Sequence, residues 1–209
     1  MSSAARVTKK PKPAVPLPPA VTHLPVRRFT VAEYHKLGEL GVISENDRVE
    51  LLHGWIVAKM GINPPHNNGV TALMELFQGL QIPDTTIRVQ QPITTTDSEP
   101  EPDIVLATGL RPTFKTRNPE PAECILVIEV AESSLREDQT TKLALYAGAK
   151  VAVYWIVNLK DRRVEVYTQP RGGKSPTYKQ RIDYGPDDAV PVVIAGTTVG
   201  TIAVKELLP

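Results

Sequence analysis

Two carboxylates stand at the ends of apolar runs, where a charged group is costly. Glu129 directly follows Cys124–Ile128, in which every side chain is apolar, as in a strand that is buried on both faces. An ionised carboxylate at such a place needs a cation, a metal or a hydrogen-bond donor. Asp103 follows Pro102 and precedes a second apolar run, Ile104–Ala107. If the two strands are neighbours, these acids converge at one end of the sheet, where a hard divalent cation would relieve their repulsion.

A helix predicted after Glu129 carries further chemistry-bearing groups. Asp138, Lys142 and Tyr146 are four residues apart, so they lie along one stripe of that helix. Lys142 is placed to reach toward the strand end. The simpler interpretation is a surface Asp138–Lys142 pair, which would add a few tenths of a kcal/mol at most.

Glu50 is the remaining candidate acid. It alternates with Val49 and Leu51 in a predicted hairpin and therefore faces the side opposite to both. Two interpretations stay open: a solvent-facing strand residue, or an additional acid near a metal. The second requires the hairpin to pack beside Asp103.

Composition excludes several other classes of site. A single cysteine, Cys124, rules out a disulfide framework and a cysteine-based zinc cluster. There is no histidine-rich cluster, glycine-rich phosphate loop or nucleophile elbow. Aromatic residues make up only 5% of the chain, which argues against a base-stacking surface. No apolar run approaches the roughly 18 residues of a membrane span, and the N-terminus does not resemble a signal peptide, so we expect a cytoplasmic protein with no membrane partner.

Charge is distributed unevenly along the 209 residues. Residues 1–28 hold six basic side chains, many prolines and no acid, which predicts a disordered, extended tail. Residues 29–209 carry 18 basic and 23 acidic side chains, a net charge near −5. The tail either aids solubility or adds non-specific attraction to phosphates, and the second effect would weaken strongly with salt.

Hydrophobic periodicity places these residues on elements. Helices are predicted over 31–40, 66–80 and 135–147, and strands over 48–52, 55–60, 87–93, 104–107, 124–130, 151–157 and 164–168, with weaker ones at 190–194 and 199–204. The expected caps and turns are a Thr30–Glu33 capping box, Asn67 or Asn68, a Ser134–Glu137 capping box, stops at Gly41 and Gly148, and a His53-Gly54 hairpin turn. The strand–helix–strand order over 124–157 predicts a parallel crossover, and hence helices on both sides of a mixed sheet.

The motifs occur in a recognisable order. They are Glu50 before His53-Gly54, Pro102-Asp103, Ile128–Ser134, Asp138-x-x-x-Lys142-x-x-x-Tyr146 and Tyr154–Val157. This ordered set resembles the Uma-type restriction endonuclease family, a bacterial branch of the PD-(D/E)XK nuclease superfamily. The similarity runs from about Phe29 to Leu208 and leaves out the tail.

The resemblance implies an α/β (α+β) restriction-endonuclease-like fold: a mixed central sheet flanked by helices, with an N-terminal helix and a β-hairpin, in one domain over 29–209. It implies that Asp103, Glu129 and the Val130 carbonyl hold Mg²⁺ or Mn²⁺ at about 2.1 Å. Lys142 would then orient the attacking hydroxide or neutralise the transition state, and Glu50 would hold a second ion or orient a water.

The chain departs from the superfamily pattern at Ala131, where a lysine is expected two residues after the second acid. Lys142 matches the position from which this branch supplies its lysine. His66 falls where members often carry a histidine after Pro-Pro; a capping or core-edge role and a catalytic role both stay open.

Three functional hypotheses follow. The first is a metal-dependent endonuclease that hydrolyses DNA phosphodiester bonds, for which a two-fold homodimer would suit cleavage of both strands. The second is a catalytically inactive nuclease-fold interaction module, which Ala131 and the acidic balance would fit. The third is a different carboxylate–metal hydrolase that acts on a nucleotide or a small phosphoester.

Overall fold

The structure is a computed structural model that describes residues 26–59, 61 and 63–209. Most of the basic tail expected over 1–28, namely residues 1–25, lies outside the described residues. Among the residues described, no helix combines the length and apolar character needed to cross a membrane.

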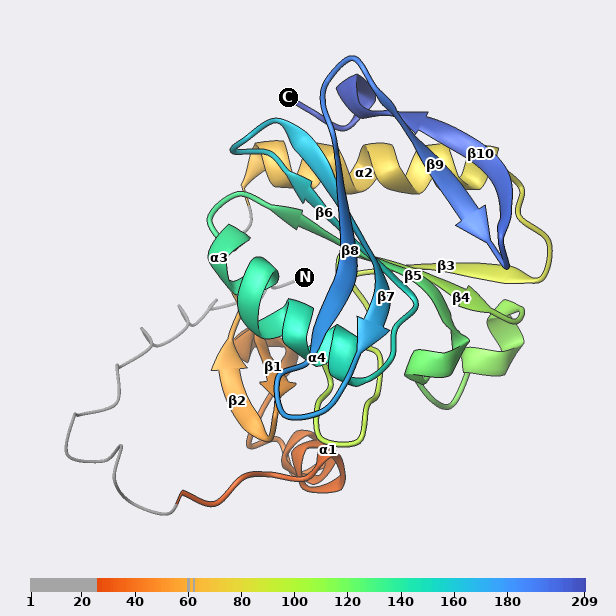
Figure 1. Cartoon of the computed structure of the whole chain (residues 1–209). Coiled ribbons are helices and arrows are strands. Elements are labelled where there is room, and N and C mark those ends of the chain that lie inside the picture. Colours follow the sequence, from red (N-terminus) through yellow and green to blue (C-terminus); the bar gives the residue numbers. More distant parts are fainter. Residues whose placement is uncertain (1–25, 60, 62) are drawn as a thin grey trace, which may run out of the picture.

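A six-stranded mixed sheet forms the centre of the molecule (Figure 1). Its spatial order follows the chain: β3 (Thr85–Val89), β4 (Ile104–Thr108), β5 (Cys124–Ala131), β6 (Val153–Asn158), β7 (Arg163–Arg171) and β8 (Thr177–Tyr184). Every neighbouring pair is antiparallel except β5 and β6, which are parallel as the predicted crossover requires. Two hairpins form separate two-stranded sheets: β1 (Val49–Leu52) with β2 (Trp55–Ala58), and β9 (Ala189–Ile194) with β10 (Thr197–Ala203).

Two helices pack on opposite faces of this sheet, α2 (Pro64–Gly79) on one face and α4 (Leu143–Gly148) on the other. A short helix, α3 (Leu135–Glu137), precedes α4, with a π-helical turn over Asp138–Lys142 between the two. Helix α1 (Val31–Glu39) lies beside β1, where the Tyr34 hydroxyl donates to the Val49 carbonyl at 3.2 Å. Short 3₁₀ turns occur at Glu45–Asp47, Arg111–Phe114, Pro121–Glu123 and Val204–Glu206. The predicted mixed sheet flanked by helices, with an N-terminal helix and hairpin, is therefore confirmed.

Alternation along the buried strands divides the interior into two cores. Ile128 and Val130 point to the face covered by α2 and the β9–β10 hairpin. Val127 and Ala131 point to the opposite face, which α4 and the β1–β2 hairpin cover. Because β5 is buried on both faces, its only acid, Glu129, has no route to bulk solvent except past the end of the sheet.

Several local predictions are confirmed by hydrogen bonds. Thr30 and Glu33 form the capping box of α1. Gly41 ends that helix in a left-handed conformation (φ 69°), with the Val42 N–H donating to the Leu37 carbonyl at 2.9 Å. His53 and Gly54 both have positive φ, as a tight hairpin turn requires.

The caps predicted for the other two helices are wrong. Asn63, not Asn67 or Asn68, caps α2: it accepts from the His66 N–H, and prolines occupy the first helical turn, where no donor is needed. Ser134 makes no side-chain cap, because its own backbone is already helical (φ −80°, ψ −6°) rather than extended. The left-handed stop after α4 is Lys150 (φ 68°), not Gly148.

Several strands and helices also differ from prediction. The strand expected over 87–93 ends at Val89, because Gln90 turns in a left-handed conformation. β8 was not predicted; it is an edge strand whose side chains are mostly exposed and polar, so it carries little hydrophobic signal. The helix expected over 135–147 is interrupted by the π-helical turn.

Candidate active site

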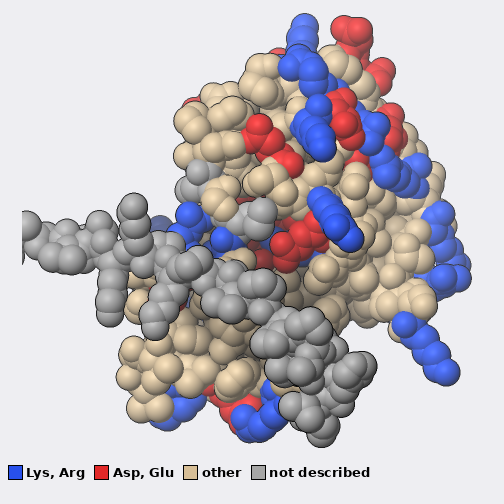
Figure 2. Space-filling view, turned by 90° about the vertical axis from the view of Figure 1, so that its left-hand side faces the viewer, with Lys and Arg blue, Asp and Glu red and all other residues tan. Residues whose placement is uncertain are grey.

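A cavity of about 900 Å³ opens at the end of the sheet where β5 finishes. Its lining comes from α1, the β1–β2 hairpin, the start of α2, the segment before β4 and the segment that follows β5. Figure 2 shows acidic side chains gathered in a hollow of this face, with Lys and Arg beside them. Eight of the described lining residues are carboxylates, namely Glu39, Glu50, Glu101, Asp103, Glu129, Glu132, Glu137 and Asp138.

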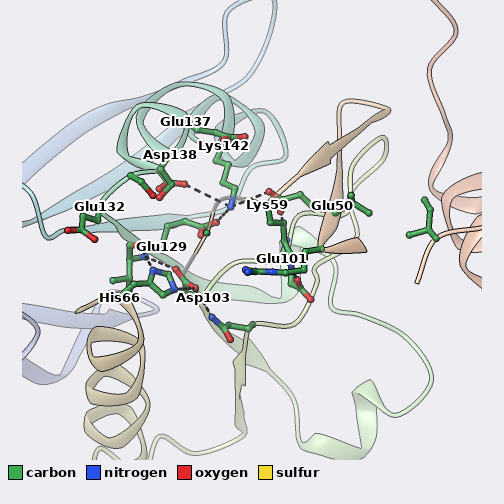
Figure 3. A pocket seen from close by; sticks show the side chains of 18 of the residues that line it. Glu50, Lys59, His66, Glu101, Asp103, Glu129, Glu132, Glu137, Asp138 and Lys142 are labelled. Atoms are coloured by element: carbon green, nitrogen blue, oxygen red, sulfur yellow. Dashed lines mark hydrogen bonds and ion pairs between the residues drawn. The ribbon is translucent and has the colours of Figure 1, made fainter. Parts of the chain in front are cut away.

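Asp103 and Glu129 both line this cavity, on neighbouring strands (Figure 3). The register of β4 and β5 explains why: Ile104 pairs with Ile128 in an antiparallel ladder, so the residues one step further along face each other. Asp103 is 7% exposed and Glu129 is 4% exposed. The structure thus brings together the two acids that the sequence places at strand ends.

Glu129 is held by two donors on the helical segment after it. The Lys142 Nζ lies 3.0 Å from its Oε1, and the Tyr146 hydroxyl donates to the same oxygen at 2.8 Å. Burial raises the pKa of Glu129 well above its ordinary value; Lys142 opposes this shift, and Asp138 and the other nearby acids add to it. The carboxylate is therefore in a place where additional positive charge is favourable.

Lys142 lies among three carboxylates rather than at the surface. Besides Glu129, its Nζ is 3.5 Å from Glu50 and 3.9 Å from Asp138. Burial alone would lower the pKa of Lys142, but the neighbouring carboxylates outweigh it and the pKa is raised. The simpler interpretation of an exposed Asp138–Lys142 pair is wrong, since both side chains are buried.

The burial of Ala131 explains why the lysine beside Glu129 does not come from position 131. It is fully buried in the core beneath α4. A lysine at 131 would drive a long charged side chain into that packing. Lys142 instead brings an ammonium group to Glu129 from the helical side.

Glu50 faces the cavity and not the solvent. It is 4% exposed, and its Oε2 accepts from the backbone N–H of Glu101 at 2.9 Å. The hairpin is fixed there because Leu51 bridges to Glu99 through paired backbone hydrogen bonds. The condition set by the sequence, that the hairpin packs beside Asp103, is met, and the solvent-facing interpretation is wrong.

Asp103, Val130 and His66 form a second linked group. The Asp103 Oδ2 accepts from the Val130 N–H at 2.8 Å. His66, in the first turn of α2, has its Nδ1 2.9 Å from the Val130 carbonyl and its Nε2 3.1 Å from the Asp103 Oδ1. Asp103 raises the pKa of His66, against the effect of burial. His66 thus contacts both of the other groups through its ring nitrogens.

Sequence reasoning missed one cation in the cavity. Lys59, at the end of the β1–β2 hairpin, lines it and pairs with Glu101. The alternation that singled out Glu50 also points to Lys59: Glu50 pairs with Val57, and Lys59 is two residues further on the same face.

The donor chemistry of the cavity suits a hard cation. Carboxylate and carbonyl oxygens are the ligands that Mg²⁺ and Mn²⁺ prefer. Among the described residues, no hydrogen bond of normal geometry reaches either side-chain oxygen of buried Asp138. Burial raises the pKa of this carboxyl to about 6, although Lys142 and Ser134 oppose the shift. As the described side chains stand, no three His, Cys, Asp or Glu residues are grouped to hold one ion together.

Residues 31–198 match the family model described as "Uma2: Putative restriction endonuclease". The chain belongs to the Uma2 family. This match spans the hairpin, the sheet and the helical segment that supply the cavity's acids, which confirms the family resemblance seen in the motifs.

One solved structure has the same overall fold as this Uma2 chain. It is the crystal structure of a "putative nuclease belonging to DUF820" from Anabaena variabilis, with a TM-score of 0.63 and 16% sequence identity over 86% of this chain and 97% of that one. At that identity the likeness shows the fold alone. No curated protein matches the chain. Family and fold together make this a restriction-endonuclease-like protein of the nuclease type.

Proposed function

We propose that this protein is a divalent-metal-dependent nuclease that hydrolyses DNA phosphodiester bonds. The observation that carries the proposal is the convergence of Asp103 and Glu129 at one end of the sheet, with Lys142 3.0 Å from Glu129. Two acids at the ends of adjacent strands, with a lysine beside them, are the set that the family's nuclease chemistry calls for. The match to the Uma2 model supports DNA as the substrate.

In this proposal Asp103, Glu129 and the Val130 carbonyl would hold Mg²⁺ or Mn²⁺. When bound, the ion would activate water as a Lewis acid and stabilise charge on the phosphoryl oxygens. The raised pKa of Glu129, caused by burial and by neighbouring acids, supports this assignment because a cation would relieve that excess of negative charge.

Other residues of the cavity would position the Glu129 carboxylate and orient water. Tyr146 fixes the Glu129 carboxylate by donating to its Oε1. Lys142 keeps Glu129 and Glu50 from repelling each other, and from this position it would orient the attacking water. Glu50 would orient a second water or hold a second ion, from the hairpin side of the cavity.

The test is cleavage of duplex DNA by the full chain with Mg²⁺ or Mn²⁺, with and without a chelator. We expect nicking or cutting that the chelator abolishes. Asp103→Asn and Glu129→Gln should each slow cleavage at least about 100-fold, because loss of a metal ligand should exceed the effect of losing an outer-shell partner. Both substitutions keep the side chain's size, so melting temperatures identify variants that have unfolded. Asp187→Asn and Glu75→Gln, at exposed positions away from the cavity, are the matched controls.

A calorimetric titration with Mn²⁺ separates this proposal from the inactive-module hypothesis. The wild-type chain should give binding heat that both site variants lose and both controls keep. Absence of heat together with absence of cleavage would contradict the metal-dependent nuclease. Full activity of Asp103→Asn or Glu129→Gln would remove that residue from the site.

A further inference from the structure

The cavity holds an excess of carboxylates, which would repel any substrate that carries phosphate. Its described lining holds eight carboxylates but only three Lys or Arg side chains, Arg48, Lys59 and Lys142. Lys142 is 9% exposed and lies among Glu50, Glu129 and Asp138, so its charge is largely balanced inside the protein. Arg48 has a partner of its own. A phosphate needs a cation that faces the open part of the cavity.

Lys59 has the position that this requires. Its backbone N–H donates to the Arg48 carbonyl at 2.9 Å, which extends the hairpin ladder one step past β2 and fixes where the side chain leaves it. On that face of the hairpin Lys59 is diagonal to Glu50, whose cross-strand partner is Val57. Figure 3 labels Lys59 beside Glu50 and Glu101 in the cavity.

The environment of Lys59 differs from that of Lys142 in two ways. Its side chain is 24% exposed, so a ligand in the cavity can reach it. Within the part of the chain that the structure describes, it forms an ion pair with one carboxylate, Glu101, which is itself 27% exposed. Burial lowers the pKa of Lys59 in spite of nearby Glu50, which means that the ammonium group is incompletely compensated and would gain from an added anion.

We propose that Lys59 is the residue that binds a non-bridging oxygen of the scissile phosphate, while Lys142 serves the carboxylates. This inference rests on the proposed nuclease function. It assigns the two lysines different tasks: Lys142 holds the acids together at the sheet end, and Lys59, entering from the hairpin, neutralises charge that develops on the phosphoryl oxygens in the transition state. Lys59 is then a catalytic residue, because it touches the substrate.

The experiment compares Lys59→Met, Lys59→Arg and Glu101→Gln in the full chain, with Mn²⁺ and duplex DNA. Loss of one donor to the transition state typically costs about 100-fold in kcat, and we expect a loss of that size for Lys59→Met. Lys59→Arg should recover part of it. Calorimetric affinity for Mn²⁺ should not weaken in Lys59→Met, because the lysine is not a ligand.

Glu101→Gln separates a catalytic role from a structural one. It removes the same ion pair but leaves the Lys59 ammonium in place, and the Glu101 backbone N–H still serves Glu50. We expect Glu101→Gln to lose much less activity than Lys59→Met, because the ammonium group that contacts the phosphate remains. Equal losses in Glu101→Gln and Lys59→Met would mean that Lys59 only anchors the hairpin, and would overturn the inference.

Lys36→Met is the matched control, since Lys36 also pairs with a glutamate, Glu39, but is 63% exposed and does not line the cavity. Unchanged kcat in Lys59→Met would contradict the role of Lys59 even if wild type cleaves DNA. Absence of cleavage by wild type would instead contradict the nuclease function itself, so the two failures are distinguishable.

Discussion

Glu165 is a buried carboxylate that lies outside the cavity but supports it. It is fully buried, and its oxygens accept from Asn158 at 2.7 Å, Tyr167 at 2.7 Å and Gln139 at 2.9 and 3.0 Å. Arg163 and Arg181 lie 3.2 and 3.1 Å away. Gln139 belongs to the π-helical turn that also carries Asp138 and Lys142. Glu165 therefore fastens the segment that delivers the lysine to Glu129.

We predict that Glu165→Gln lowers the free energy of unfolding by about 2 kcal/mol at pH 7, the usual range for a hydrogen-bonded charge. Burial opposes ionisation of Glu165, but the side-chain hydrogen bonds from Asn158, Gln139 and Tyr167 prevail, and its pKa is lowered. A lowered pKa contributes stability above the unfolded value, about 4.3, and that contribution is lost as pH falls through the folded value.

Urea unfolding at pH 7 and again near pH 3.5 checks this. The difference in free energy of unfolding between wild type and Glu165→Gln should be smaller near pH 3.5 than at pH 7. The exposed control Glu75→Gln should differ little from wild type at either pH. A gap that widened in acid would contradict the assigned direction of the shift.

The residues of the candidate site were only partly predictable from the sequence. Glu129 and Asp103 were found because a carboxylate at the end of an apolar strand requires a partner. The burial of Glu50 could not be predicted, because it depends on where the hairpin packs, which only the Leu51–Glu99 bridge reveals. Lys59 was missed because a lysine at the end of a hairpin is normally solvated.

At the scale of elements, the π-helical turn shows what a local pattern omits. Residues 135–147 have ordinary helical periodicity, and nothing in their sequence requires five residues to widen into a π turn. The contacts at that turn come from distant strands: Gln139 bonds to Glu165 on β7, and Lys142 pairs with Glu129 on β5 and Glu50 on β1. π-helical turns are often found at functional sites for this reason, since they reposition side chains within a helix.

Helix α2 packs closely against β5 at Gly69. A Cβ on Gly69 would lie 3.1 Å from Val130 Cγ1 and 3.6 Å from the Leu207 carbonyl, so α2 approaches the strand as closely as it does only because residue 69 has no side chain. That approach also brings His66 to the Val130 carbonyl. We expect Gly69→Leu to destabilise by about 1–3 kcal/mol through overpacking.

Gly79→Leu is the matched control for this change, since a Cβ at Gly79, on the same helix, meets nothing within 4 Å. Gly79→Leu should leave the free energy of unfolding unchanged or raise it by up to about 1 kcal/mol, because leucine has the higher helix propensity. Thermal or urea unfolding measures both variants. Equal stabilities for the two leucine variants would show that the α2–β5 contact tolerates a larger side chain.

At the scale of the whole molecule, the architecture followed from a few strong signals. The unbroken apolar run of β5, followed by a helix and a second apolar strand, predicted the parallel crossover that the sheet contains. β8 gave no such signal, because an edge strand with mostly exposed side chains is stabilised by its ladder with β7 and not by a hydrophobic face. Charge is the other property of the whole chain, and it is not uniform.

The acidic body and the basic N-terminal residues make opposite contributions to DNA binding. Residues 29–209 have a net charge near −5, while residues 1–25 contain Arg6, Lys9, Lys10 and Lys12 and no acid. Each basic side chain that contacts duplex phosphates steepens the slope of log affinity against log salt by about 0.9. We therefore predict that deletion of residues 1–25 weakens duplex binding at low salt and makes that slope shallower by at most about 4.

Fluorescence anisotropy with Ca²⁺ in place of Mg²⁺, between about 50 and 200 mM salt, measures this slope without turnover. A chain whose first 25 residues are scrambled, with composition kept, should bind like wild type, because phosphate attraction depends on charge and not on order. If the deletion leaves the slope unchanged, the N-terminal charges do not contact DNA, and their role is confined to solubility. If the scrambled chain loses affinity as the deletion does, the order of these residues matters, and recognition there is more specific than charge attraction.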